Sequence, residues 1–154
     1  MLRIVGVAGT FGPLHQGHKF LLRKAFEVGE KVLIALTTES MLQRKIMKEK
    51  IPSYEKRTQL LETYLKEEGY QGRYEIIPLN DKFGVAITLA EQEGIVVSED
   101  TAGVVEEINK IRIQKGFKPL TIFIIKLLLA QDGTPISSTR IRKDEINAEG
   151  HPIK

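Results

Sequence analysis

Short apolar runs recur along this sequence, separated by segments with the residue spacing of amphipathic helices. The runs show little polar alternation, which is typical of strands covered by protein on both faces. Strands joined through helices run parallel, because a parallel pair needs a long crossover connection. The predicted strands are residues 4–8, 31–37, 74–79, 95–98 and a stretch within 120–129. The pattern therefore predicts an α/β fold, a Rossmann-like five-stranded parallel sheet with helices on both faces, in a single domain over residues 1–154.

The segments between the runs carry recognisable helix starts and ends. The predicted helices are residues 17–28, 53–68, 85–93 and 101–115, with a short one near residue 137. Ser53 is suited to cap the second helix, and Gly29 is expected to end the first as a C-terminal cap. Gly69 and Gly116 follow two other helices in the same way. Residues 143–154 are expected to form a loosely ordered tail.

The composition is that of a globular protein: of 154 residues, 42% are apolar and 28% are charged. The chain contains no cysteine, which excludes disulfides and thiolate chemistry and is compatible with the cytoplasmic location that we expect. The longest apolar run, residues 120–130, is interrupted by Lys126 and is shorter than the roughly 20 residues of a membrane span. We therefore expect no membrane partner.

The net charge of +3 favours small anionic ligands and is too small to demand nucleic acid. Four tyrosines, six phenylalanines and no tryptophan offer few stacking platforms for a single strand. We therefore expect no nucleic-acid partner, and no obligate protein partner is evident.

The loop after the first predicted strand leads into a helix start that holds two of the chain's three histidines, His15 and His18. Helix N-termini bind anions through free N–H groups and the positive end of the dipole. Residues three apart on the first turn can address one ligand, and Gly17 between them lets a phosphate approach the backbone. Thr10 adds a hydroxyl donor. A loop that only turns the chain is the alternative, but the combination favours a phosphate site in which imidazoles stabilise developing charge.

A second polar stretch, residues 136–142, follows a strand and a turn. Its three hydroxyl residues, beginning at Ser137, can both cap a helix and donate to phosphate oxygens. Arg140 and Arg142 add guanidinium groups suited to phosphates. Alone, a plain helix cap with solvated arginines would be the better interpretation; beside the histidine loop, phosphate binding is favoured.

Residues 44–57 form a basic run, which contains six lysine and arginine residues and only two glutamates. Such a run usually forms a solvated face. A site that holds two polyanions needs a basic lid, and we favour a ligand role for Lys45.

The sequence Gly9-Thr10-Phe11, followed by His15-Gln16-Gly17-His18, resembles the first signature of the nucleotidyltransferase superfamily that carries an H-x-G-H motif. That signature usually has an acidic residue where this chain has Gly12, and the change removes an acceptor that could brace the loop. Residues 136–142 resemble the second signature, I-S-S-T-x-x-R, with Arg142 at its final basic position. In this fold the two signatures would meet at adjacent strand ends.

Over nearly its whole length the chain resembles the archaeal type of phosphopantetheine adenylyltransferase. The matching segments are residues 42–45, 52–57, 97–101, 108–112 and 132–135. The resemblance implies that ATP and 4′-phosphopantetheine give dephospho-coenzyme A and pyrophosphate, with Mg²⁺ held mainly by the ATP phosphates. No Ser–His–Asp set, paired acid–base carboxylates or dedicated metal cage is visible, so we expect no metal ligands from the protein. This fits in-line attack of the acceptor phosphate on the α-phosphorus, for which the protein supplies positioning and charge stabilisation.

The resemblance also implies roles for individual residues, with His18 as the main donor to the transition state. The residues expected in catalysis are His18, Lys45, Thr10 and Arg142. Those expected at ATP are Gly9, Thr10, Phe11, His15, Gly17, His18, Ser98, Glu99, Asn109, Arg112, Ile136, Ser137, Ser138, Thr139 and Arg142. Those expected at 4′-phosphopantetheine are Thr10, Lys45 and Arg57. Within the ATP set, the four residues from Ser98 to Arg112 would line the adenosine pocket. Ser137, Ser138 and Thr139, with Arg142, would hold the β- and γ-phosphates.

Two other functions stay open at this point. Another transferase of the superfamily, such as a nicotinamide-mononucleotide adenylyltransferase or a cytidylyltransferase, would share both signatures. A non-catalytic ATP-binding module is the second alternative, and Gly12 is its best support.

Overall fold

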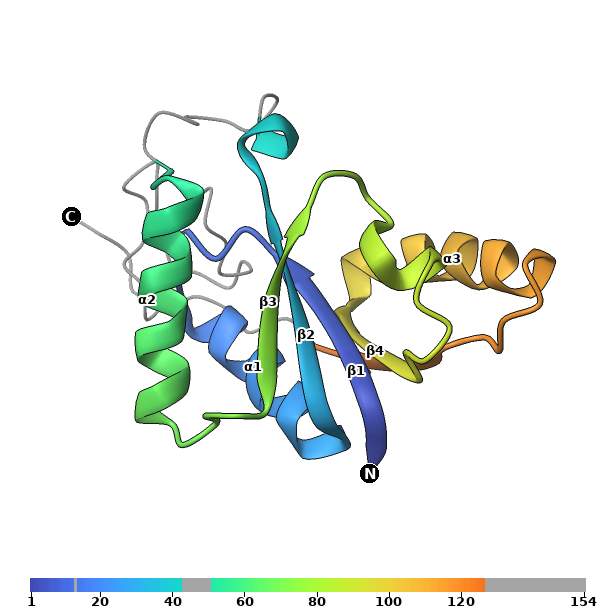
Figure 1. Ribbon diagram of the computed structural model, residues 1–154, viewed down its shortest axis with the longest axis horizontal. Coiled ribbons are helices and arrows are strands. Elements are labelled where there is room, and N and C mark those ends of the chain that lie inside the picture. The colour runs from blue at the N-terminus through green and yellow to red at the C-terminus, as the bar shows by residue number, and fades with distance from the viewer. Residues whose placement is uncertain (13, 43–50, 127–154) are drawn as a thin grey trace.

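The computed structural model describes residues 1–12, 14–42 and 51–126, which are built around one parallel sheet (Figure 1). The strands are β1 (Leu2–Gly9), β2 (Gly29–Thr37), β3 (Tyr74–Leu79), β4 (Gly94–Ser98) and β5 (Thr121–Ile125). Their order in the sheet is β3-β2-β1-β4-β5, and every neighbouring pair is parallel. The Rossmann-like five-stranded parallel sheet predicted from the apolar runs is confirmed.

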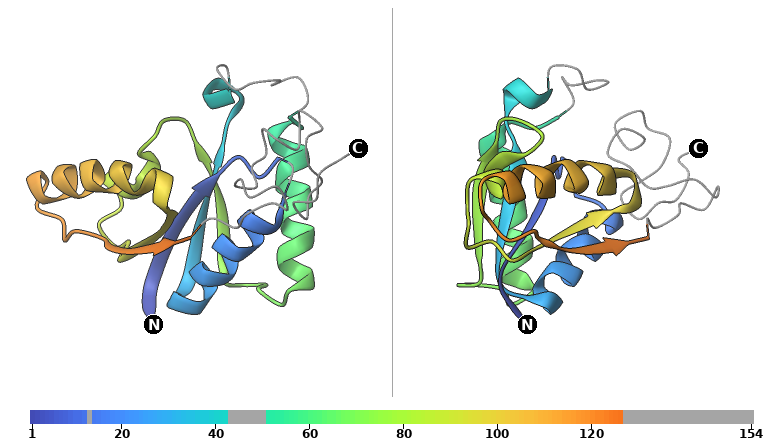
Figure 2. Two further views of the ribbon diagram at one scale, coloured as in Figure 1. Left: turned by 180° about the vertical axis from the view of Figure 1, so that it is seen from behind. Right: turned by 90° about the vertical axis from the view of Figure 1, so that its right-hand side faces the viewer.

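Helices cover both faces of this sheet, as predicted. The helices are α1 (Gln16–Val28), α2 (Tyr54–Glu67) and α3 (Ala102–Gln114), and the 3₁₀ turns are η1 (Glu39–Leu42), η3 (Gly84–Ile87) and η4 (Glu99–Thr101). Helices α1 and α2 lie on the opposite side of the sheet from α3 (Figures 1 and 2). In the described ranges, no helix is both long and apolar enough to cross a membrane.

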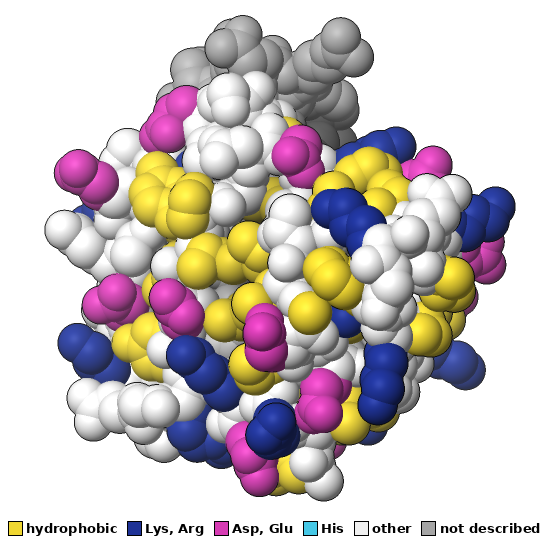
Figure 3. Space-filling model, turned by 45° about the vertical axis from the view of Figure 1, so that its right-hand side comes forward, with side chains coloured by type: hydrophobic (Ala, Val, Ile, Leu, Met, Phe, Trp, Pro, Cys, Tyr) yellow, Lys and Arg dark blue, Asp and Glu magenta, His cyan; other side chains and the backbone are white. Residues whose placement is uncertain are grey.

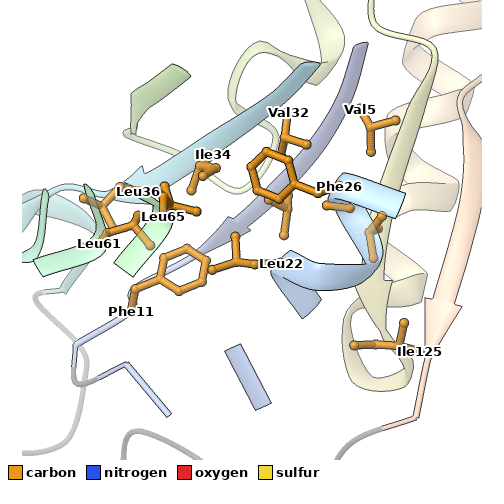
Figure 4. Close-up of a cluster of buried hydrophobic side chains, with 13 residues drawn as sticks. Val5, Phe11, Leu22, Phe26, Val32, Ile34, Leu36, Leu61, Leu65 and Ile125 are labelled. Carbon is orange, nitrogen blue, oxygen red and sulfur yellow. The ribbon is translucent and has the colours of Figure 1, made fainter. Parts of the chain in front are cut away.

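The larger core lies between the sheet and helices α1 and α2. Every second residue of β1 and β2 faces it, and each large side chain buried there contributes about 1.5–3 kcal/mol. The side chains labelled in Figure 4 are Val5, Phe11, Leu22, Phe26, Val32, Ile34, Leu36, Leu61, Leu65 and Ile125. This packing holds the N-terminus of α1 at the carboxyl end of β1.

A smaller core lies on the other face of the sheet. Ile95 and Val97 of β4 pack there against Val105 and Ile108 of α3. Strands β2 and β4 flank β1 on opposite sides, so the chain order reverses between β1 and β4. In open parallel sheets, ligands bind outside the carboxyl ends of the strands at this reversal.

The predicted helix over residues 85–93 is wrong, because only the short turn η3 forms in that segment. The segment instead directs its carbonyl groups at one buried guanidinium, that of Arg112. Arg112 donates to the carbonyl oxygens of Ala86, Leu89 and Gln92 at 2.8–3.0 Å. A long-range cation therefore satisfies the acceptors that a helix would have satisfied locally.

The predicted helix ends are confirmed at all four positions. Ser53 caps α2 by accepting a hydrogen bond from the Lys56 N–H at 3.2 Å. Gly69 and Gly116 have φ angles of +83° and +84°, the left-handed conformation expected after a helix. Gly29 is the C-cap of α1, and its backbone N–H donates to the Ala25 carbonyl oxygen. Its backbone is extended, and it also begins β2. Its lack of a side chain serves packing, because a Cβ would lie 2.7 Å from Cγ2 of Val5.

Candidate active site

A cavity of about 500 Å³ lies at the carboxyl end of the sheet. Each strand contributes a residue at or next to its last position, in order of sequence Thr10, Thr37, Leu79, Ser98 and Lys126. The cavity therefore occupies the place that the reversal of chain order predicts for a ligand.

Small residues on one face of the central strands leave room for this cavity. Gly6 and Ala8 of β1 and Ala35 of β2 line it, and the side chains of Val5 and Val7 of β1 belong to the larger core. Since side chains alternate along a strand, one strand can fill a core on one side and leave a hollow on the other.

The two histidines of the first signature cap helix α1 together. His15 is the N-cap residue, and its Nδ1 accepts a hydrogen bond from the backbone N–H of His18 at 3.3 Å. The backbone N–H of His15 donates in return to Nδ1 of His18, also at 3.3 Å. The two rings stack with their centroids 3.7 Å apart. Both imidazoles are thus held on the wall of the cavity before any ligand arrives.

This reciprocal cap also decides which nitrogen carries the proton. A ring nitrogen that accepts a hydrogen bond has no proton of its own, so both His15 and His18 carry theirs on Nε2. Burial lowers the pKa of His15 from its usual 6.5 to about 4, because the charged ring would lose its hydration. The His15 ring is therefore neutral near pH 7 and offers an Nε2–H donor.

Phe11 supports the histidines from the core. It has a φ angle of +50°, an uncommon conformation for a residue with a side chain, and its ring is only 1% exposed. The ring packs beside Leu22 in the larger core (Figure 4). Its centroid lies 4.7 Å from that of the His18 ring. Phe11 was expected among the ATP-binding residues, but its side chain lies behind the cavity wall and supports His18.

The glycines of the first signature have packing roles that the sequence did not specify. A Cβ on Gly17 would lie 2.9 Å from Cε1 of His15, so this glycine makes space for the His15 ring. A Cβ on Gly9 would lie 3.1 Å from the Phe11 ring. A Cβ on Gly12 would lie 2.8 Å from Cδ of Arg57, which occupies the space next to the loop.

Thr10 belongs to a buried hydrogen-bonded chain that reaches the cavity. Nη1 of Arg57 donates to the hydroxyl oxygen of Thr37 at 3.2 Å, and the Thr37 hydroxyl donates to the Thr10 hydroxyl at 3.1 Å. The same Nη1 donates to the Thr10 carbonyl oxygen at 3.1 Å. Sequence reasoning missed Thr37, although a hydroxyl residue at the last position of a predicted central strand was a usable signal.

Arg57 was expected to contact the acceptor substrate directly, and its position corrects this. The side chain is fully buried behind Thr10 and Thr37 and does not line the cavity. Its Nε donates to the Pro52 carbonyl oxygen at 2.9 Å, while its Nη2 has no hydrogen-bond partner among the described residues. Burial lowers the pKa of the Arg57 guanidinium, and the charge of Glu39 opposes that shift.

Of the four residues expected at the adenosine, only Ser98 lines the cavity. Ser98 lines the cavity at the end of β4, next to Thr101. Glu99 is exposed and does not line it. Lys82 and Lys126, which sequence reasoning did not select, are exposed lysines on the cavity wall, and Lys82 also pairs with Glu107 at 3.1 Å.

Asn109 and Arg112 have structural roles in place of the expected adenosine contacts. The Asn109 side chain exchanges two hydrogen bonds with the backbone of Leu120, at 2.7 and 3.3 Å, which fixes the connection from α3 to β5. Arg112 is fully buried and donates to carbonyl oxygens of the β3–β4 connection and of Lys118. Neither side chain lines the cavity.

The remaining predicted site residues lie outside the described residues. They are Lys45, Ile136, Ser137, Ser138, Thr139, Arg140 and Arg142, and the expected tail over residues 143–154. Their predicted roles stay predictions.

Charged side chains are interspersed on the face drawn in Figure 3. Among the described residues drawn there, lysine and arginine side chains alternate with aspartate and glutamate. That face carries no basic stripe of the kind that tracks a nucleic-acid backbone.

The sequence model of the cytidylyltransferase-like family matches residues 7–144. This chain belongs to that family. Within this family, the chain is similar over nearly its whole length to two curated relatives that share one name. A phosphopantetheine adenylyltransferase from Thermococcus gammatolerans is 45% identical over 152 residues, which are 99% of this chain and 95% of the relative. Another from Methanothermobacter thermautotrophicus is 43% identical over 151 residues, or 98% of this chain and 90% of the relative.

Solved structures agree with the fold. A protein of unknown function from Archaeoglobus fulgidus has a TM-score of 0.71 and 28% identity, covering 81% of this chain and 89% of that one. A bifunctional NMN adenylyltransferase/ADP ribose pyrophosphatase from Francisella tularensis has a TM-score of 0.64 at 19% identity, covering 93% of this chain and 42% of that one. At that identity the second likeness concerns the fold alone.

Proposed function

We propose that this chain transfers the adenylyl group of ATP to 4′-phosphopantetheine, giving dephospho-coenzyme A and pyrophosphate. The observation that carries the proposal is the stacked and mutually capped pair His15 and His18, which lines a cavity at the switch point of the sheet. The near full-length similarity to relatives named phosphopantetheine adenylyltransferase supports this choice of substrates.

The chemistry needs no covalent intermediate on the protein. An oxygen of the acceptor phosphate forms a bond to the α-phosphorus of ATP, while the bond from that phosphorus to the bridging oxygen breaks and its electron pair leaves with pyrophosphate. Negative charge grows on the oxygens around the α-phosphorus. A donor fixed in advance stabilises this charge without reorganising, and the capped His18 ring fits that role.

The cavity offers different surroundings for the two ends of the acceptor. Thr10 supplies a hydroxyl for its phosphate, and Leu33, Ile77 and Leu79 supply an apolar wall for its pantetheine arm. Lys45, Ser137, Ser138, Thr139 and Arg142 keep their predicted roles as further phosphate ligands in this proposal.

Magnesium enters this proposal with the nucleotide, where it neutralises phosphate charge. Within the described ranges, no group of three or more histidine or carboxylate side chains is arranged to hold a metal ion. Binding of the ion mainly through the ATP phosphates is part of the proposal. A cytoplasmic location remains a prediction from composition.

The proposal is tested by pyrophosphate release from ATP and Mg²⁺, with and without 4′-phosphopantetheine. We expect release that depends on this acceptor and yields dephospho-coenzyme A in equal amount. A panel with nicotinamide mononucleotide, and with CTP plus a polyol phosphate, covers the other transferases of the superfamily. Turnover with a panel substrate and none with 4′-phosphopantetheine would overturn the proposal.

ATP binding without turnover on any acceptor would support a non-catalytic module. The structure weakens the argument for that alternative, because Gly12 has a packing reason to lack a side chain: Arg57 fills the adjacent space.

A further inference from the structure

We propose that Thr37 is a positioning residue: held by Arg57, it directs the hydroxyl proton of Thr10 into the cavity, where that proton binds the phosphate of the acceptor. The inference rests on the proposed function, and it adds a residue that neither signature contains. It starts from the directions of three hydrogen bonds.

The guanidinium sets these directions, because it can only donate. Nη1 of Arg57 donates to the Thr10 carbonyl oxygen at 3.1 Å and to the Thr37 hydroxyl oxygen at 3.2 Å. The Thr37 hydroxyl accepts from the cation, and its single proton is donated to the Thr10 hydroxyl oxygen at 3.1 Å. The proton of Thr10 cannot point back along this chain.

The remaining direction for the Thr10 proton is the cavity. Thr10 and Thr37 are 7% and 6% exposed, and both line the cavity, whereas Arg57 lies behind them. A free hydroxyl rotates among several orientations, and a ligand must then restrict it. The hydrogen bonds from Arg57 through Thr37 remove this entropic cost before the ligand binds, because they leave the Thr10 hydroxyl one favourable donor direction.

The positive charge of Arg57 strengthens the hydrogen bonds that run through Thr37 to Thr10, and it favours an anionic ligand. Arg57 is fully buried and forms no ion pair with a carboxylate among the described residues. Hydrogen bonds that begin at a cation are stronger than neutral ones, and each polarises the next in a low-dielectric interior. An anion at Thr10 would face this buried charge across two hydroxyl groups, so the chain favours a phosphate over a neutral ligand.

The test compares binding of 4′-phosphopantetheine and of pantetheine, which lacks the phosphate, by calorimetry beside turnover. Thr37→Val keeps the shape of the side chain but removes the hydroxyl that links Arg57 to Thr10. Thr37→Ser keeps that hydroxyl. We expect Thr37→Val to weaken binding of 4′-phosphopantetheine about tenfold, to leave pantetheine unchanged, and Thr37→Ser to restore most of the loss. Thr58→Val is the matched control, because its hydroxyl bonds the Tyr54 carbonyl within α2, away from the cavity.

A double-variant cycle separates positioning from a general effect on packing. If Thr37 acts through Thr10, Thr10→Val combined with Thr37→Val binds 4′-phosphopantetheine no more weakly than Thr10→Val alone. Additive losses, or equal losses for both ligands, would overturn the inference.

Failure of this inference is distinguishable from failure of the proposed function. A wild-type protein that makes dephospho-coenzyme A, with Thr37→Val unchanged in binding, refutes only the role of Thr37. A wild-type protein that binds 4′-phosphopantetheine without turnover refutes the function, while the comparison of binding still decides the role of Thr37. A wild-type protein that neither binds nor converts this acceptor refutes both.

Discussion

Two arginines, Arg57 and Arg112, are the largest fully buried side chains of the described residues, and they serve opposite faces of the sheet. Arg112 donates to backbone carbonyl oxygens from the β3–β4 connection and from Lys118, and its own side chain does not line the cavity. Arg57 makes fewer bonds, keeps one nitrogen without a partner among the described residues, and is connected through hydroxyl groups to the cavity. An arginine thus fixes backbone segments on one face of the sheet, whereas on the other face an arginine is connected to the candidate site.

The difference lies in what each guanidinium can still attract. A buried cation is costly unless hydrogen bonds satisfy it, and Arg112 is satisfied by carbonyl dipoles alone. Arg57 retains charge that is only partly compensated, next to a cavity lined by threonines and histidines. Substitutions of the two residues should therefore separate stability from ligand binding.

The largest expected effect is on stability, in Arg112→Lys. A lysine cannot reach the carbonyls of Ala86, Leu89 and Gln92 together, so buried acceptors lose their partners. We expect a loss of about 4 kcal/mol in the free energy of unfolding, measured by urea denaturation. Lys110→Met on the exposed side of the same helix is the control and should change it by less than about 0.5 kcal/mol. A loss in Arg112→Lys as small as the control's would contradict a fastening role.

Acidification should destabilise the histidine cap. The pKa of His15 is about 4 when folded against 6.5 when exposed, so only the unfolded chain gains this proton between these values. The free energy of unfolding should be highest above pH 6.5 and should fall by about 3 kcal/mol from this group as the pH drops to 4. His15→Asn, which keeps a capping oxygen and cannot titrate, should flatten that part of the curve. Identical curves for wild type and His15→Asn would refute the buried neutral ring.

Compared with Arg112→Lys, Arg57→Lys should lower the stability less and weaken the binding of 4′-phosphopantetheine more. It keeps the charge but loses the fixed geometry that joins Pro52, Thr10 and Thr37. We expect about 2 kcal/mol of lost stability and roughly tenfold weaker binding of 4′-phosphopantetheine. Calorimetry with this ligand, at a temperature where the variant is folded, measures the second effect. Equal ligand binding in Arg57→Lys and wild type would remove the contrast between the two arginines.

The smallest expected effect belongs to Gly12→Ala. The added Cβ would lie 2.8 Å from Cδ of Arg57, so the guanidinium must shift by a few tenths of an ångström. We expect about 1 kcal/mol of lost stability, measured by thermal unfolding. No change would mean that Arg57 yields freely, and that the loop does not depend on this contact.

The sequence alone predicted the sheet, because unalternated apolar runs and helical spacing are local patterns that tertiary packing reinforced. It also predicted His15 and His18 at the start of α1, since a strand, a loop and a helix in succession place that turn at the sheet edge. The reciprocal cap between the two rings was not foreseen, because it depends on rotamers.

The errors have a common physical origin in long-range hydrogen bonds. Residues 85–93 have helical spacing, yet the carbonyls of Ala86 and Leu89 accept from a guanidinium 26 and 23 residues further along the chain. Arg112 and Asn109 were assigned to ATP because basic and amide side chains suit nucleotides, but both side chains form hydrogen bonds with backbone groups of this protein. Thr37 went unnoticed for the converse reason: one hydroxyl at the end of a strand acquires meaning only beside Arg57 and Thr10.

The central claim is that His18, fixed by the cap of α1, stabilises the charge that develops as the adenylyl group moves. The most direct measurement is kcat for pyrophosphate release from ATP and 4′-phosphopantetheine by His18→Ala, alongside its unfolding temperature. The account predicts a kcat lower by a factor of about 10²–10³ in a protein that still folds, because one preorganised donor is lost. A folded His18→Ala protein with the wild-type kcat would contradict it.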